Sequence, residues 1–123
     1  MNGDMAARQC YRVKKDYVSP YPNALEIRVG ETLAVSDKKS EWAGWLWCTN
    51  SDRRSGWIPE SRVERTGDRC RVLRDFTTRE LSVRIGERLV AEREESGWLW
   101  CVNERQQSGW VPQDHLEELK PEG

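Results

Sequence analysis

The stretches "GWLWCTN" at residues 44–50 and "SGWIPESRVE" at residues 55–64 each have a second copy in this chain. The copies read "GWLWCVN" at residues 97–103 and "SGWVPQDHLE" at residues 108–117, in the same order. These two clusters contain six of the seven tryptophans. Because one copy of an internal repeat corresponds to one structural unit, the clusters predict two similar units in this chain of 123 residues.

The similarity extends toward the N-terminus of each cluster. Two further pairs of segments match in the same order: "RVKKDY" (12–17) with "RVLRDF" (71–76), and "ALEIRVGETL" (24–33) with "ELSVRIGERL" (80–89). We therefore expect one domain at residues 10–64 and a second at residues 70–119. The intervening "RTGDR" at residues 65–69 is short, polar and contains glycine, which is typical of a tight linker.

Short apolar stretches rich in β-branched and aromatic residues predict β-strands throughout each repeat. In the first repeat the expected strands are residues 12–17, 32–36, 45–50, 56–59 and 62–64. No stretch has a sustained helical period. About five short strands are too few for two packed sheets, and a small curled barrel is the natural arrangement. The fold class is therefore predicted to be all-β, with two tandem small barrels.

The tryptophans are predicted to face outward, because side chains alternate between the two faces of a strand. Leu46 and Cys48 suit the interior of a small barrel, which places Trp45 and Trp47 on the outer face. The turn "NSDRRS" at residues 50–55 is expected to set Trp57 roughly opposite Trp45. The same alternation applies in the second repeat to Trp98, Trp100 and Trp110. A contiguous outward aromatic surface usually marks a binding site, although it could instead seal one barrel against the other.

The charge balance argues against several classes of partner. The chain has 20 basic and 21 acidic residues, so it has no strong long-range field to attract nucleic acid or an anionic membrane. No apolar run approaches the ~20 residues of a membrane helix, and the N-terminal residues lack the order of a secretory signal. We expect a cytoplasmic protein without membrane insertion.

No catalytic or metal site is expected. The four cysteines form no C-x-x-C pair, so neither a zinc site nor another cofactor is predicted. Cys48 and Cys101 occupy equivalent places inside apolar runs and are expected to be small buried side chains. His115 is the single histidine, and no serine or cysteine nucleophile has a visible base partner. The chain is therefore predicted not to be an enzyme.

Taken in order, these motifs resemble those of a Src-homology 3 (SH3) domain, twice. The family's A-L-Y-D-Y strand is similar to "VKKDY" and "VLRDF", and its E-L-S-F-x-x-G-D/E turn is similar to "ALEIRVGE" and "ELSVRIGE". Its G-Y/W-I/V-P-x-N-Y-V ending is similar to "GWIPESRV" and "GWVPQDHL". The resemblance implies SH3-like barrels that bind proline-containing peptides in the polyproline II conformation. The tandem layout also resembles oxidase organiser subunits, whose paired SH3 domains share one groove.

The resemblance implies two peptide-binding grooves. The groove of the first repeat would consist of Tyr17, Trp45, Trp57 and Pro59, and that of the second repeat of Phe76, Trp98, Trp110 and Pro112. Two ridge tyrosines of the family are replaced in each repeat: by Lys15 and Arg62 in the first, and by Arg74 and His115 in the second.

The loops that follow the first strand differ from the family in charge. The loop at residues 18–24 has no acid, and the shorter loop of the second repeat keeps only Glu80. An arginine-anchored ligand is therefore not expected for the first groove. The cationic residues at its edge, Lys15 and Arg62, predict instead a peptide that carries Asp or Glu. Three alternatives stay open: a Tudor-type aromatic cage for a methylated or cationic side chain, base stacking with nucleic acid, and tryptophan faces that only make a domain–domain or self-association contact.

Overall fold

The computed structural model describes residues 9–20, 24–40 and 43–120. Within these residues the chain is almost entirely β, with twelve strands and two single-turn 3-10 helices. The strands are β1 (Gln9–Val13), β2 (Glu26–Ile27), β3 (Thr32–Ser36), β4 (Trp45–Thr49), β5 (Ser55–Pro59), β6 (Val63–Thr66), β7 (Arg69–Val72), β8 (Phe76–Thr77), β9 (Arg88–Glu95), β10 (Trp98–Asn103), β11 (Ser108–Pro112) and β12 (Leu116–Glu118). The 3-10 helices are η1 (Glu60–Arg62) and η2 (Gln113–His115).

The strands form two equivalent five-stranded sheets. One sheet has the order β11-β10-β9-β1-β12 and the other the order β5-β4-β3-β7-β6, while β2 and β8 make a separate two-stranded ladder. The predicted all-β fold class is confirmed. No helix among the described residues is long and apolar enough to cross a bilayer.

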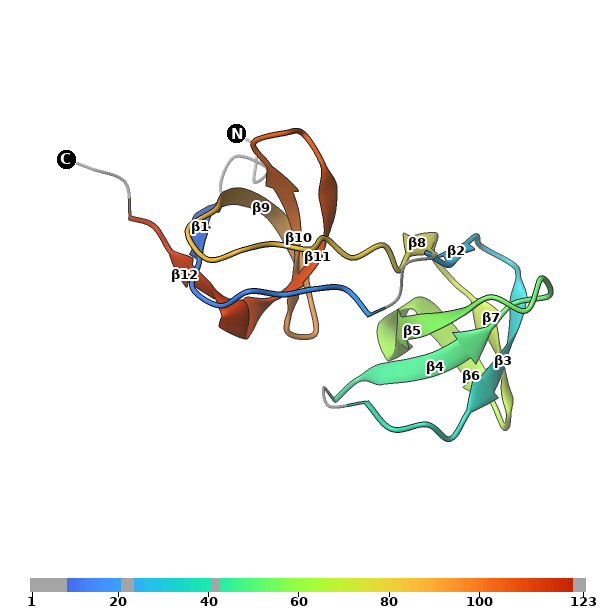
Figure 1. Ribbon diagram of the computed structural model, residues 1–123. Coiled ribbons are helices and arrows are strands. Elements are labelled where there is room, and N and C mark those ends of the chain that lie inside the picture. Colours follow the sequence, from blue (N-terminus) through green and yellow to red (C-terminus); the bar gives the residue numbers. More distant parts are fainter. Residues whose placement is uncertain (1–8, 21–23, 41–42, 121–123) are drawn as a thin grey trace. The chain divides into compact units, whose positions relative to one another are not determined.

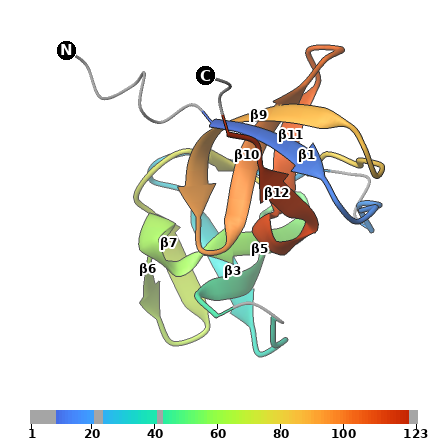
Figure 2. The same ribbon diagram turned by 90° about the vertical axis from the view of Figure 1, so that its left-hand side faces the viewer.

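Each sheet contains one strand from the other repeat. Strand β1 of the first repeat lies between β9 and β12 of the second, pairing antiparallel with both. Figure 2 shows β1, in blue, alongside the orange β9 and the red β12. Conversely, β7 of the second repeat lies between β3 and β6 of the first; in Figure 1, β3 is cyan and β6 and β7 are yellow-green. The two repeats have therefore exchanged their first strands.

The exchange defines two compact units. We call the unit made from both ends of the chain, Met1–Pro20 with Glu80–Gly123, the terminal unit. The unit made from Tyr21–Arg79 is the central unit. These units differ from the predicted domains at residues 10–64 and 70–119, because the sequence repeat gives the order of the strands and not which copies pair.

The predicted linker at residues 65–69 lies within a β-hairpin of the central unit. Strands β6 and β7 pair directly, with Arg65 opposite Cys70 and Thr66 opposite Arg69. Gly67 makes the turn with a φ of 63°, in the left-handed region that glycine adopts without strain. The segment therefore closes a hairpin, and the chain passes between the units at residues 20–21 and 79–80.

The buried core of the terminal unit draws on both repeats. Val13 from β1 is 1% exposed and packs with side chains that all come from the second repeat: Leu81, Val83, Leu89, Ala91, Leu99, Cys101, Val111 and Leu116. In the central unit, Val72 from β7 is equally buried, between strands β3 and β6 of the first repeat. Because burying apolar area is the main favourable term in folding, each unit depends on the strand that it receives.

Candidate functional site

The two tryptophan clusters lie on equivalent hairpins, β4–β5 and β10–β11. The Asn50 side-chain oxygen accepts hydrogen bonds from the Asp52 and Arg54 amides at 2.9 and 3.0 Å, and Arg53 has a φ of 66°. This turn sets Trp47 opposite Trp57 and leaves Trp45 opposite Pro59. The prediction that Trp57 lies opposite Trp45 is therefore wrong, because the partner of Trp57 is Trp47, two residues further along the strand.

The tryptophans of the two hairpins differ in exposure. Cys48 and Ile58 are fully buried, as predicted, and Leu46 is half-buried. The rings of Trp45, Trp47 and Trp57 are half-buried.

In the second hairpin Trp98, Trp100 and Trp110 are only 7%, 8% and 2% exposed. The prediction that these three indoles face water is wrong, even though Leu99 and Cys101, which alternate with the first two, belong to the core.

Neighbouring side chains account for part of this burial. The Arg93 guanidinium lies 4.9 Å from the ring centroid of Trp100 and 5.6 Å from that of Trp110. The two indole rings meet edge to face at 5.2 Å. Arg93 is the cross-strand neighbour of Trp100 in β9, so it covers an outer face that strand alternation alone would leave open.

A second aromatic group of the terminal unit, which we call the terminal cluster, consists of Tyr17, Glu80, Trp98, Pro112 and His115. The Tyr17 ring packs edge to face against Trp98 at 5.6 Å and against His115 at 5.5 Å. The Tyr17 hydroxyl donates a hydrogen bond of 2.6 Å to a carboxylate oxygen of Glu80. Pro112 is fully buried and lies opposite Trp98 in the hairpin.

Glu80 is held in this cluster by its backbone. It forms an isolated bridge with Trp110, and the Leu81 amide donates to the Trp110 carbonyl at 3.1 Å. Gly109 permits this approach, because a Cβ there would lie 2.7 Å from the Glu80 carbonyl carbon. Desolvation by the surrounding chain raises the pKa of the Glu80 carboxyl, and the hydrogen bond from Tyr17 opposes that shift.

The central unit contains the equivalent central cluster: Trp45, Pro59, Arg62 and Phe76. The rings of Trp45 and Phe76 are 6.2 Å apart and tilted by 59°. The Arg62 guanidinium lies 5.3 Å from the Phe76 ring centroid and donates to the Asp75 carbonyl at 3.1 Å. Phe76 is 8% exposed. This cluster has a cation where the terminal cluster has a histidine.

The structure regroups the predicted grooves. Tyr17 was assigned to Trp45 and Phe76 to Trp98, but Tyr17 lies beside Trp98 and Phe76 beside Trp45. The reason is the exchange, since Tyr17 and Phe76 follow the exchanged strands β1 and β7. Lys15 therefore belongs to the terminal unit and Arg74 to the central unit, where both are exposed.

Trp57 and Trp110 do not belong to these clusters. Each lies two residues before the proline of its hairpin, Pro59 or Pro112. Trp57 meets Trp47 edge to face at 4.9 Å, and the Lys38 ammonium lies 3.9 Å from the Trp47 centroid. Sequence reasoning missed Lys38 and Arg93 as partners of these rings. Arg93 could have been identified from its position in the strand that pairs with the tryptophan strand. Lys38 follows the end of β3, and no sequence pattern indicates that it contacts a ring.

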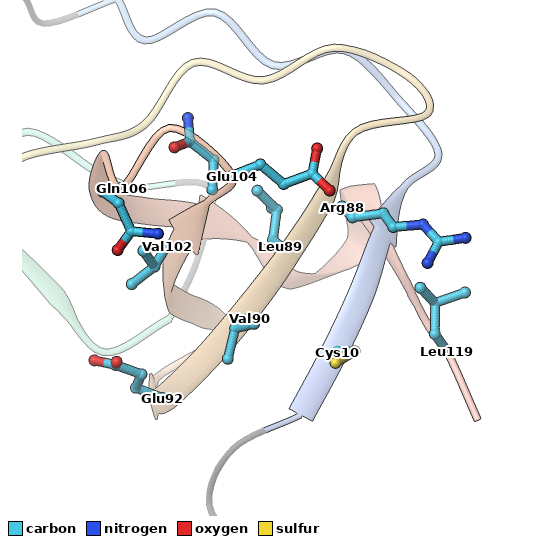
Figure 3. Close-up of a pocket in the computed structure, with 10 residues that line it drawn as sticks. Cys10, Arg88, Leu89, Val90, Glu92, Val102, Glu104, Gln106 and Leu119 are labelled. Carbon is cyan, nitrogen blue, oxygen red and sulfur yellow. The ribbon is translucent and has the colours of Figure 1, made fainter. Parts of the chain in front are cut away.

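A separate pocket of about 500 Å³ lies in the terminal unit, and no residue of either cluster lines it. Figure 3 shows Cys10 on β1 and Val90 on β9 facing this pocket together with Val102 of β10. These three side chains form one cross-strand row, because Cys10 pairs with Val90 and Val90 with Val102. Arg88, Glu92 and Glu104 add charges around it. None of the predicted site residues lines this pocket.

Each unit is a small all-β body with an aromatic cluster beside one hairpin. The model of the variant SH3 domain family matches the chain twice, at residues 10–65 and 69–119. The chain therefore belongs to the SH3 family, as a tandem of two such domains, and SH3 domains are non-catalytic modules that bind protein ligands.

One similar protein is an SH3 and F-BAR domain-containing protein of Dictyostelium discoideum. It is 29% identical to this chain over 121 residues, which cover 86% of this chain. The chain spans 22% of the length of that relative. The likeness to oxidase organiser subunits stays a prediction.

Proposed function

We propose that the terminal and central clusters each bind an extended, proline-containing peptide segment, so that the chain acts as a two-site adaptor. One observation carries the proposal: the same pair of aromatic rings occurs in both units, Tyr17 with Trp98 at 5.6 Å and Phe76 with Trp45 at 6.2 Å. In each pair one ring is half-buried, Tyr17 or Trp45, and we infer that this ring contacts the prolyl ring, while its partner, Trp98 or Phe76, is buried. The preformed polyproline II conformation of the ligand keeps the entropy cost of binding low.

The charges beside the two clusters favour different ligands. The central cluster carries the Arg62 guanidinium, and the nearby Asp75 carboxylate already accepts a hydrogen bond from the Val29 amide at 2.9 Å. We infer that the central cluster prefers a peptide with Asp or Glu beside its prolines. The terminal cluster carries the Glu80 carboxylate next to Tyr17, which favours a basic peptide residue there.

The loop at residues 18–24, whose lack of acids argues against an arginine-anchored ligand, has residues 21–23 outside the described part of the chain. The preference is therefore argued from Arg62 and not from this loop. Lys15 and Arg62, which the sequence placed at one groove edge, belong to different units.

The Tudor-type alternative has a weaker physical basis. Trp47 and Trp57 do form an aromatic pair that attracts a cation, but the cation beside them is Lys38 of this chain, 3.9 Å from the Trp47 centroid and 5.7 Å from the Trp57 centroid. A methylated lysine would have to displace that ammonium from the ring face.

The test is isothermal titration of the full chain with two proline-rich peptides that differ only in carrying glutamate or arginine. We expect Trp45→Ala to weaken the glutamate peptide at least about tenfold, as for an aromatic anchor. Trp47→Ala is the matched control, because Trp47 lies in the same strand and is also half-buried. If Trp47→Ala abolished binding and Trp45→Ala left it intact, the site would be the Lys38 ring pair and the proposal would fail.

A further inference from the structure

The exchange of first strands raises the question of what selects it. We divide each repeat into a head and a body. The heads are residues 9–20 and 69–79, and the bodies are residues 24–66 and 80–119. Each unit then contains the head of one repeat and the body of the other. The tight β6–β7 hairpin at Gly67 favours the exchange by chain connectivity. Because the repeats are otherwise similar, any side-chain selection between the two arrangements has to come from the residues that differ.

Several head–body contacts are the same in both units and cannot select a partner. The Asp16 carboxylate accepts a hydrogen bond from the Ile85 amide at 2.7 Å, and the equivalent Asp75 accepts one from the Val29 amide at 2.9 Å. Likewise, Arg12 pairs with Glu117 as Arg71 pairs with Glu64. These contacts fix the register of a head on a body, whichever repeat it comes from.

The core of each unit matches in size across the head–body junction. In the terminal unit the large Tyr11 pairs with Leu89 and packs against the core. Ala91, two residues further along β9 on the same face, is small and 3% exposed. In the central unit the position of Tyr11 is taken by the small Cys70, which pairs with Leu33.

The position of Ala91 is correspondingly taken in the central unit by the larger Val35, which is 8% exposed. Joining each head to its own body would put Tyr11 beside Val35 and Cys70 beside Ala91. The first combination overpacks the core and the second leaves a gap, and both are unfavourable.

A polar contact adds to the match. The Tyr17 hydroxyl donates to the half-buried Glu80 carboxylate at 2.6 Å. The equivalent residues of the central unit are Phe76 and Ala24, which have neither the hydroxyl nor the carboxyl group. If the heads returned to their own bodies, Glu80 would face Phe76 and lose its hydroxyl donor, which is costly for a partly buried acid.

We propose that the body of each repeat binds the head of the other repeat of the same chain. This pairing is specified by four positions at which the repeats differ: Tyr11 or Cys70, Tyr17 or Phe76, Ala91 or Val35, and Glu80 or Ala24. Neither repeat then completes an aromatic cluster by itself. The inference concerns how the clusters are assembled and does not depend on which peptide they bind.

The full chain in solution tests the proposal by nuclear Overhauser effects. Tyr17 bridges to Val83 in the exchanged arrangement, whereas joining each head to its own body would place it beside Ile27, where Phe76 now pairs. We expect contacts from the Tyr17 ring to the Val83 methyl groups. Contacts to Ile27 instead would overturn the proposal. So would Tyr17–Val83 contacts that appear only between isotopically labelled and unlabelled chains, because the head would then come from a second copy.

A variant tests whether these residues select the pairing. Tyr11→Cys, Tyr17→Phe, Cys70→Tyr and Phe76→Tyr together give each head the side chains of the other. We expect the contacts of residue 17 to move from Val83 to Ile27. Retention of the wild-type contacts would show that the selection lies elsewhere and would overturn the proposal.

If the fourfold variant does not fold, a double-mutant cycle decides. Tyr17→Phe and Glu80→Gln should be coupled by at least about twofold in the unfolding equilibrium constant, because the two side chains share one hydrogen bond. Additive effects of these two substitutions would contradict the polar part of the match.

Discussion

The hydroxyl of Tyr17 donates a hydrogen bond of 2.6 Å to the carboxylate of Glu80, which lies 63 residues further along the chain and in the other repeat. The bond joins the exchanged first strand to the body that receives it. It also lies at the edge of the terminal cluster. The same pair of side chains therefore bears on folding, on pH dependence and on ligand recognition.

Replacing the Tyr17 hydroxyl should destabilise the protein measurably. Tyr17→Phe keeps the ring against Trp98 and removes only the donor, so we expect a loss of about 1.5–3 kcal/mol, typical of a hydrogen bond to a charged group. Urea denaturation measures it. Tyr11→Phe is the matched control in the same head and should be nearly neutral. If both variants lost the same free energy of unfolding, the hydrogen bond to Glu80 would make no specific contribution to stability.

The pH dependence of stability follows from Glu80. Its pKa is raised from the ordinary 4.5 because burial desolvates the carboxyl. The folded state therefore keeps the proton to higher pH than the unfolded state. The stability that this proton contributes is complete below about 4.5 and is lost as the pH rises through the raised pKa.

Glu80→Gln should flatten the pH profile in this window, because the amide does not titrate. Urea midpoints of the wild type and the variant between about pH 4 and pH 7 measure the difference. A difference that stayed constant across the window would be inconsistent with a raised pKa at Glu80.

Two equivalent glycines should differ in their tolerance of alanine. A Cβ on Gly109 would lie 2.7 Å from backbone atoms of Glu80 and Leu81, whereas on Gly56 it would meet the Thr78 side chain at 2.9 Å. Backbone cannot yield as a side chain can, so Gly109→Ala should cost about 1–3 kcal/mol and Gly56→Ala less. Thermal unfolding of the two variants compares them. A larger loss for Gly56→Ala would contradict the close approach of Glu80 to β11.

The four cysteines should differ in reactivity. Cys10 is exposed, whereas Cys48 and Cys101 are fully buried and desolvation raises the pKa of each thiol to about 12. Since the thiolate is the reactive form, a disulfide reagent should label Cys10 fast and the other three thiols only on unfolding. Cys10→Ser should abolish the fast phase. A second fast thiol in the native protein would contradict the burial of the core cysteines.

The sequence allowed much of this fold to be predicted. The strand Thr32–Ser36 coincides with its predicted range, and the other four predicted strands of the first repeat overlap β1, β4, β5 and β6, whereas β2 was not predicted. Cys48 and Ile58 point inward as alternation requires. These features are local, because they depend on the side-chain period of a strand and on the residues of a turn.

Other features depend on contacts between distant residues and were not predictable in the same way. Which head joins which body rests on differences such as Tyr11 against Cys70, and these have meaning only once the register is known. The register of Trp57 depended on the left-handed Arg53 in the turn. The burial of Trp100 required knowledge that Arg93 of β9 covers it.

The most direct test of the account follows the indole N–H resonances while the acidic proline-rich peptide is added to the full chain. We expect the Trp45 signal to shift with saturation while those of Trp47 and Trp100 stay nearly unchanged, since the central cluster is the proposed site for that peptide. If peptide addition left Trp45 unmoved, or moved the Trp47 signal alone, the assignment of the central cluster as a peptide-docking site would be refuted.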